Sequence, residues 1–190
     1  VDDGSSDESI QQVLLVQKEQ SERNIRLIKQ KNAGVSAARN KGAELAQHNY
    51  ISFLDADDSY TPIFLYTIIS LINDFPQSRF FATAYDFISL NSGVKKTIRI
   101  SGLNSNKHNQ LLTDFFLIAA SGDLPFCASS FCIEKKLFQD VEGFPVGENM
   151  GEDQSLYCEV ALNKHPIAFS PIACSHYFLA VEGSLMQTEK

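Results

Sequence analysis

The chain has 190 residues, of which 44% are hydrophobic and 21% charged, values typical of a globular protein with a substantial core. This composition excludes a disordered or fibrous chain. Sixteen basic residues stand against 23 acidic ones, and the formal charge of −7 opposes general binding to nucleic acid or to an anionic membrane. The longest apolar run, at residues 63–72, is far shorter than the roughly 20 residues that a bilayer-spanning helix needs.

The sequence opens on Val1-Asp2-Asp3-Gly4, with neither an initiator methionine nor a charged-then-apolar leader. We therefore expect no secretory signal, and we expect the chain to be a fragment whose beginning is absent. The cysteines lack the close pairs of a structural zinc site, which predicts reduced core residues in a reducing compartment. They are Cys127, Cys132, Cys158 and Cys174.

The first half alternates turn-rich, helical and strand-like segments, a βαβ rhythm that predicts a mostly parallel sheet with helices on its faces. The predicted elements are a helix at 9–20, a strand at 24–30, a helix at 35–47, a strand at 50–54 and a helix at 63–75. Thr61-Pro62 supplies a capping hydroxyl and an early proline for the last helix. Because this helix is apolar on nearly every side, we expect it to be buried.

The second half predicts α+β elements appended to the first sheet. In chain order they are β-rich stretches at 80–89 and 95–100, a polar loop at 102–109, an amphipathic segment at 110–120, a strand at 127–133, helices at 134–140 and 152–163, and a strand at 167–178 that Pro171 interrupts. No linker separates the halves, so one compact unit is expected.

Three carboxylates, those of Asp55, Asp57 and Asp58, follow directly after the apolar strand at 50–54. Like charges at this spacing repel unless a cation or hydrogen-bond donors compensate them. An oxygen-only cluster suits Mg²⁺ or Mn²⁺, which leaves coordination positions open for a phosphate ligand. The alternative is that these aspartates are turn and cap residues before the helix that follows.

Four ordered blocks resemble a known family. They are VDDGSSD at 1–7, NAGVSAARN at 32–40, the strand with its acidic DADD end at 50–58, and GF at 143–144 followed by GED at 151–153. Together they resemble the inverting nucleotide-sugar glycosyltransferases of family 2. The resemblance implies an α/β, GT-A-like fold with a mostly parallel sheet flanked by helices. It also implies a single domain whose first strand-helix unit is missing, with a Rossmann-like nucleotide-sugar-binding half at 1–78 and an acceptor-side half at 79–190.

The resemblance also implies roles on the donor side of the site. Asp3 would contact the nucleobase, and Arg39 would lie near the nucleotide. Asp55 and Asp57 would engage the ribose and the metal-diphosphate, and Asp58 could replace Asp57 as the metal ligand. For Arg39 the alternative is a position on a solvated helix face.

On the acceptor side, Asp153 would be the general base, and its neighbour Glu152 is assigned to the substrate-binding residues. The alternative for both acids is that they cap the helix at 152–163. The implied reaction is a metal-dependent transfer, with Mn²⁺ or Mg²⁺, from a nucleoside diphosphate sugar to an acceptor hydroxyl. A UDP-sugar is the favoured donor, and the acceptor is a glycan or a lipid-linked glycan.

The implied setting is the synthesis of surface polysaccharide or another glycan in the bacterial cytoplasm, with peripheral association with the inner membrane left open. Two alternatives remain at this point. One is a nucleotide-sugar or glycan-binding module that has lost catalysis. The other is a haloacid-dehalogenase-like phosphatase with Asp55 as nucleophile, which the two βα-like units before Asp55 and the Ser at position 59 both disfavour.

Overall fold

The computed structural model describes residues 1–100, 108–112, 114–148 and 150–179, which form two compact units. One unit comprises Val1–Gln47 and Glu142–Leu156, and the other comprises His48–Val141 and the chain from Tyr157 onward. The predicted division at residue 78 differs from these boundaries. The predicted division separates the residues that bind the donor from those on the acceptor side, and this functional division stays a prediction. The predicted polar loop at 102–109 lies mostly outside the described residues.

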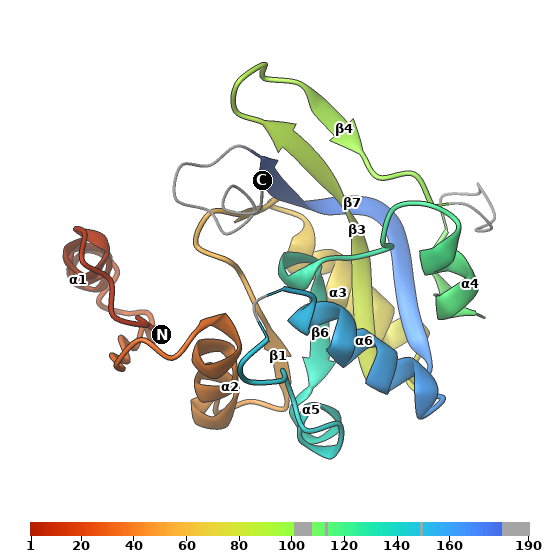
Figure 1. Ribbon diagram of the computed structural model, residues 1–190, viewed down its shortest axis with the longest axis horizontal. Coiled ribbons are helices and arrows are strands. Elements are labelled where there is room, and N and C mark those ends of the chain that lie inside the picture. Colours follow the sequence, from red (N-terminus) through yellow and green to blue (C-terminus); the bar gives the residue numbers. More distant parts are fainter. Residues whose placement is uncertain (101–107, 113, 149, 180–190) are drawn as a thin grey trace. The chain divides into compact units, whose positions relative to one another are not determined.

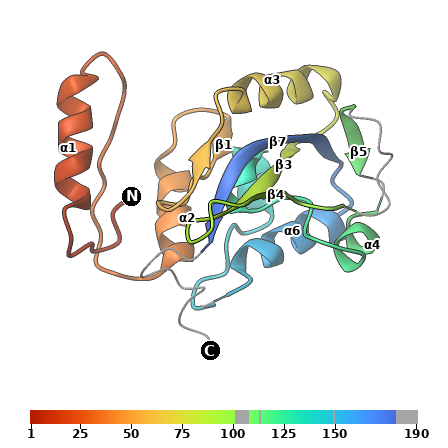
Figure 2. The same cartoon turned by 90° about the horizontal axis from the view of Figure 1, so that it is seen from above.

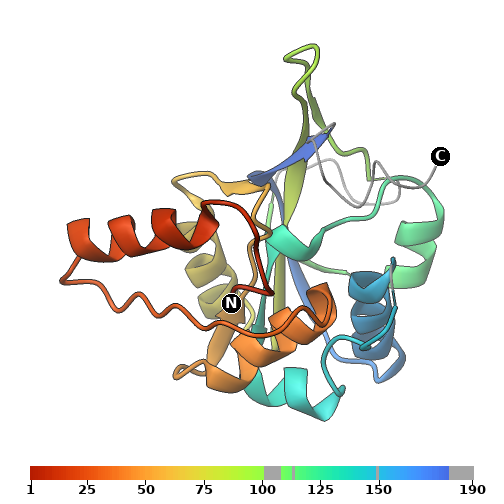
Figure 3. The same ribbon diagram turned by 60° about the vertical axis from the view of Figure 1, so that its left-hand side comes forward.

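The first unit contains helices α1 (Ser9–Glu19) and α2 (Val35–Leu45), joined by an extended segment (Figure 3). Both helices were predicted, but none of the residues of α1 is buried. The predicted strand at 24–30 is wrong. This segment makes a single parallel bridge, between Lys29 and Asp2, because no continuous strand lies beside it among the described residues.

The second unit is built on a seven-stranded sheet. Its strands are β1 (Tyr50–Ser52), β2 (Ser59–Tyr60), β3 (Phe80–Ser89), β4 (Lys95–Thr97), β5 (Gln110–Leu112), β6 (Phe131–Glu134) and β7 (Ile167–Leu179). The order is β1-β6-β3-β7-β2, with β4 on β3 and β5 on β7 (Figure 1).

The expectation of a mostly parallel sheet is wrong, because β3 and β7 form the one parallel pair among these strands. Strand β6 runs antiparallel between β1 and β3, so β1, β3 and β7 share one direction. Of the strands at 24–30 and 50–54 on which the βαβ rhythm of the first half rested, only the second belongs to this sheet, so the rhythm did not predict the parallel β3–β7 pair. It gave no sign of the antiparallel strands that the second half inserts.

Strand β7 contains the irregularity that Pro171 predicts. Thr83 of β3 pairs with Ser170, but Tyr85, two residues on, pairs with Ser175. Strand β7 therefore holds three more residues than β3 over this interval. Because the extra number is odd, the alternation of side chains between the two faces is reversed beyond the bulge.

Helix α3 (Phe64–Asp74) covers one face of the sheet, and α4 (Phe115–Ala120) lies on the other side (Figure 2). Phe64, Ile68 and Leu71 are buried against the sheet. The prediction that the whole helix is buried is wrong, because only this stripe meets the sheet. The outward apolar side chains are more than two-fifths exposed, and they are Ile63, Leu65, Tyr66 and Ile69.

Three further predicted segments differ in detail. The segment at 110–120 divides into β5 and α4, and the predicted strand at 127–133 begins with a 3-10 turn at Ala128–Ser130 before β6. The hydroxyl of Thr61 does not cap α3. It donates to the carbonyl of Cys174 instead, and the helix begins after Ile63 without a side-chain cap.

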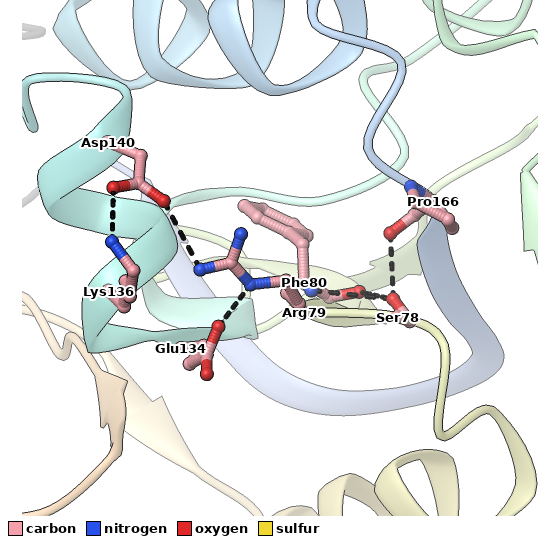
Figure 4. A network of polar contacts seen from close by, with 7 residues as sticks. All are labelled: Ser78, Arg79, Phe80, Glu134, Lys136, Asp140 and Pro166. Carbon is pink, nitrogen blue, oxygen red and sulfur yellow. Dashed lines mark hydrogen bonds and ion pairs between the residues drawn. The ribbon is translucent and has the colours of Figure 1, made fainter.

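A polar network joins the start of β3 to β6 and to α5 (Lys135–Asp140) (Figure 4). Arg79 pairs with Glu134 and lies 3.3 Å from Asp140, which also pairs with Lys136 at 3.0 Å. These groups are at least 30% exposed, so each pair adds little to stability by itself. No described helix is both long enough and apolar enough to cross a membrane.

Candidate functional site

Asp3 organises the turn that leads into α2. Its Oδ1 accepts hydrogen bonds from the Gln30 side chain at 2.7 Å and from the Ala33 amide at 3.0 Å, and its Oδ2 accepts from the Gly34 amide at 2.8 Å. Gly34 has φ of 91°, a conformation that favours glycine. The observed contacts give Asp3 a structural role at the start of α2, and its contact with a nucleobase stays a prediction.

Arg39 and Glu152, 113 residues apart, form a largely buried ion pair. Nη1 of Arg39 lies 2.7 Å from Oε1 of Glu152, and the two side chains are 10% and 12% exposed. The guanidinium also lies 5.1 Å from the centre of the Phe144 ring, within reach of a cation–π interaction. The alternative of a solvated helix face for Arg39 is therefore wrong.

Asn40 was not predicted as a site residue, although it lies in the second sequence block. Its side-chain amide donates to the carbonyl of Phe144 at 2.7 Å and accepts from the amide of Phe144 at 2.9 Å. These two hydrogen bonds hold α2 to the segment at Phe144, as the neighbouring ion pair of Arg39 holds it to Glu152. The blocks at 32–40 and 143–153 therefore form one local structure, a relation that the sequence spacing alone does not indicate.

Asp153 lies in the first turn of α6 (Glu152–Leu162), where a negative charge is favoured by the helix dipole. Its Oδ1 accepts from the Gln154 amide at 2.8 Å. The neighbouring Glu152 is directed to Arg39 rather than back to the helix end. The capping alternative is thus unsupported for Glu152, whereas the base role of Asp153 stays a prediction.

The acidic loop, which we define as residues 55–58, is held by one hydrogen bond within the loop and by two to the rest of the second unit. The Asp55 amide donates to Oγ of Ser129 at 3.1 Å, and the Asp58 amide closes a turn onto the Asp55 carbonyl at 3.0 Å. Oδ1 of Asp58 accepts from the Phe178 amide of β7 at 3.3 Å. No aspartate of the loop caps α3, because the N-cap residue of that helix is Ile63 and has no side-chain bond.

Asp58 is the most perturbed acid of the loop. Burial raises the pKa of its carboxyl from 3.8 to about 6, with smaller opposing effects from the Ser129 hydroxyl and the Phe178 amide, and the charges of Asp55 and Asp57 add to the rise. Its Oδ2 is buried and has no hydrogen-bond partner among the described groups. An oxygen donor in this condition fits a hard divalent cation, which would stabilise the ionised form.

Within the described part of the chain, no three His, Cys, Asp or Glu side chains are grouped to hold a metal ion by themselves. A magnesium-like ion commonly takes only one or two carboxylates from the protein and completes its shell with water and substrate phosphates. The acidic loop therefore fits a metal that binds together with a phosphate-bearing substrate.

A network of polar side chains that the sequence analysis did not assign to the site connects β3, β4 and β7 to the end of the acidic loop. The carboxylate of Asp86 is 2% exposed and accepts from the Thr97 hydroxyl at 2.6 Å, and it lies 2.7 Å from Nζ of Lys95. Nε2 of His176 is 4.0 Å from the same carboxylate, and its Nδ1 is 3.3 Å from the hydroxyl of Ser59. These contacts therefore connect Asp86, in the middle of the sheet, to Ser59, the residue that follows Asp58.

Asp58→Asn tests the burial of this carboxyl. The native carboxyl holds its proton up to about pH 6, whereas the unfolded one ionises near 3.8, so the parent protein loses stability as the pH rises through this interval. We expect the difference in unfolding free energy between Asp58→Asn and the parent, both measured in EDTA, to change by about 1–2 kcal/mol in favour of the variant when the pH is raised from 4 to 7.5. This value is smaller than the pKa shift alone would give, because the carboxyl is partly exposed.

Urea unfolding at the two pH values measures this gain. The matched control is Asp74→Asn, which alters an exposed acid at the end of α3. A difference between Asp58→Asn and the parent that is the same at both pH values would contradict the prediction.

The predicted site residues thus form two groups. Asp3, Arg39, Glu152 and Asp153 belong to the first unit, and Asp55, Asp57 and Asp58 belong to the second. Each group is ordered by its own contacts, and the assembly of the two into one site stays a prediction.

The sequence matches the model of a protein family described as Glycosyl transferase family 2, over residues 1–139. Over 182 residues it is 29% identical to Glycosyltransferase GlyA of Streptococcus pneumoniae serotype 4, covering 89% of this chain and 24% of that protein. Over 73 residues it is 38% identical to the Uncharacterized glycosyltransferase YibD of Escherichia coli K12, covering 37% of this chain and 20% of that protein.

Among solved structures, S. aureus TarS 1–349 in complex with UDP-GlcNAc matches with a TM-score of 0.71 at 19% identity, covering 100% of this chain and 51% of TarS 1–349. A second structure of TarS 1–349 matches with a TM-score of 0.68. The likeness confirms the predicted α/β, GT-A-like fold class. The chain spans about a quarter or less of the curated relatives and about half of the TarS chain.

Proposed function

The chain belongs to glycosyltransferase family 2, and from this premise we propose that it acts in transferring a sugar from a nucleoside diphosphate sugar to an acceptor hydroxyl, with inversion at the anomeric carbon. The family match, over residues 1–139, includes the first three of the four sequence blocks and confirms the family that they resemble, and it leaves the phosphatase alternative without support. The complex of TarS with UDP-GlcNAc favours a UDP-sugar as donor. The proposed setting is glycan or surface-polysaccharide synthesis, with a glycan or lipid-linked glycan as acceptor.

The observation that best supports this proposal is the acidic loop. The Asp55 amide is bonded to Ser129, the Asp58 side chain is bonded to the Phe178 amide of β7, and the residue after the loop pairs with β7, so the contacts at both ends hold the three carboxylates close together. Asp57 would hold Mn²⁺ or Mg²⁺, with Asp58 as the alternative ligand, and the bound ion would supply Lewis-acid stabilisation of the charge that develops on the leaving diphosphate. Asp55 would bind the ribose.

Arg39 would act on the donor side through position and charge. Its guanidinium lies in α2 and is held by Glu152, so it is preorganised rather than free to search for a ligand. A guanidinium near the N-terminal half of a helix favours a phosphate nearby. Glu152 would then be a positioning residue for Arg39, which refines its predicted place among the substrate-binding residues.

Asp153 would be the general base of the transfer. The acceptor oxygen forms its bond to the anomeric carbon as the bond from that carbon to the diphosphate oxygen breaks. The electron pair of the broken bond leaves with the diphosphate, and the hydroxyl proton passes to the carboxylate of Asp153. Proton transfer to a positioned base contributes roughly 10²- to 10⁴-fold in rate.

Removal of divalent ions tests the metal in this proposal. In the intact protein, we expect EDTA to weaken the binding of UDP-GlcNAc and to lower sugar transfer, with recovery on addition of Mn²⁺. Asp57→Asn should have the same effect without lowering the melting temperature of the metal-free protein, because it relieves repulsion within the loop.

Calorimetric titration of UDP-GlcNAc and a transfer assay measure these effects, and Asp74→Asn is again the control. Unchanged binding and transfer in EDTA would contradict the metal dependence. Donor binding that is metal-dependent but never followed by transfer would instead favour a module that has lost catalysis.

A further inference from the structure

A hollow lies between the β3–β4 hairpin and the end of β7, outside the acidic loop. Its volume is about 420 Å³, which is within the range of small-molecule sites. Its lining residues are Phe87, Ser89, Ser92, Val94, Lys96 and Leu179. None of them is among the residues that sequence reasoning assigned to the site.

The strand register explains why these side chains share one face. Phe87 of β3 pairs with Lys96 of β4 and with Tyr177 of β7, and Ser89 pairs with Leu179. Directly paired residues point to the same face of a sheet. The alternate residues, including Asp86 and His176, therefore point to the opposite face.

Phe87 is fixed by two other aromatic rings. Its ring centre lies 5.1 Å from that of Tyr85, which is buried, and 5.7 Å from that of Tyr177, in edge-to-face geometry in both cases. Such contacts hold the ring in place. Phe87 is only partly buried, so part of its ring remains available to the hollow that it lines.

The hollow and the acidic loop both contact the end of β7, the hollow at Leu179 and the loop at Phe178. Asp58 accepts from the amide of Phe178, and Ser59, the residue after the loop, pairs with His176, so Tyr177 lies between two residues of β7 that contact this part of the chain. A ligand over Phe87 would therefore be separated from the acidic loop by Tyr177, whose ring contacts that of Phe87.

The chemistry of the lining selects for a sugar ring. The C–H groups on one face of a pyranose carry partial positive charge and are attracted to the negative face of an aromatic ring. Lys96 and the two serines offer polar groups at the rim, where sugar hydroxyls need partners. Lys95 is engaged with Asp86, whereas Lys96 has no ion-pair partner among the described side chains.

We propose that this hollow binds a sugar ring of the acceptor glycan, with Phe87 as the stacking residue. This inference rests on the proposed transferase function, since it assigns the acceptor to a surface that Tyr177 separates from the acidic loop. It predicts that changes in the hollow alter the affinity for glycan and leave the binding of donor unchanged.

An array of bacterial surface oligosaccharides, probed with the intact protein, tests the inference. We expect the parent protein to retain at least one oligosaccharide, and we expect Phe87→Leu to weaken that retention about fivefold to tenfold. Phe87→Tyr keeps the ring and should retain the same oligosaccharide. Tyr66→Leu, which removes a 77% exposed ring from α3, is the matched control and should not change it.

Val94→Glu provides a second variant at an exposed position that does not depend on the packing of Phe87. It extends a charged side chain into the hollow beside Lys96 and should weaken retention at an unchanged melting temperature. Failure of the parent to retain any oligosaccharide, or equal retention by Phe87→Leu and Val94→Glu, would overturn the inference. A failure of the proposed function is seen separately, as absence of UDP-GlcNAc binding in calorimetry.

Discussion

Asp153→Asn lowers sugar transfer by at least roughly 100-fold and leaves donor binding unchanged, if this carboxylate is the base. Asparagine keeps a side-chain oxygen that can accept the hydrogen bond from the Gln154 amide, so the start of α6 is preserved. The melting temperature should correspond to a stability change of less than about 1 kcal/mol. The transfer assay and a titration with UDP-GlcNAc measure the two effects.

Glu159→Gln is the matched control, because it removes an exposed carboxylate from the same helix. It should leave transfer unchanged. Retention of more than about a tenth of the parent activity by Asp153→Asn would assign the base to another residue. A loss of stability together with activity would instead mean that Asp153 acts mainly at the helix start.

Arg39→Met lowers the unfolding free energy by about 3–5 kcal/mol, because it leaves the carboxylate of Glu152 buried without its partner. The cation–π contact with Phe144 is lost as well. Urea unfolding, followed by hydrogen exchange of the amides in α2, measures this loss. Lys41→Met is the control in the same helix, since its pair with Glu44 is exposed and worth less than about 0.5 kcal/mol.

The double variant Arg39→Met with Glu152→Leu separates a buried charge from simple loss of packing. Removing both charges should recover much of the stability lost by Arg39→Met alone, while the binding of UDP-GlcNAc stays weak. A double variant as unstable as the single one would show that the ion pair is not the cause. Restored donor binding would contradict the proposed role of Arg39 near the phosphates.

Most helices of the second half of the fold, and the helix that begins within the second sequence block, were predictable in position from the sequence. The predictions for α2, α5 and α6 match the structure within a few residues at each end. Helix α3 shows the limit, because its composition indicated burial on all sides and could not reveal that only one stripe meets the sheet. The segment at 24–30 has strand-like composition, but a strand also needs a partner, which composition does not show.

The site was predictable in its residue types and less so in its contacts. The spacing of Asp55, Asp57 and Asp58 at the end of a strand indicated an acidic site. The pairing of Arg39 with Glu152 joins residues 113 positions apart, and no local pattern indicates it. The same holds for Phe87, which looks like an ordinary strand residue until the register places it beside Tyr177.

The bulge at Pro171 in β7 determines which face of the sheet His176 points to and which face Tyr177 points to. Because β7 contains three extra residues between Ser170 and Ser175, His176 shares a face with Asp86, and Tyr177 shares the other with Phe87. Deleting one residue of the bulge would shift the phase of everything after it, so that an imidazole would replace the phenol beside the hollow. A change in chain length alone, with no substitution in the hollow, would thus alter which ligand chemistry this surface offers.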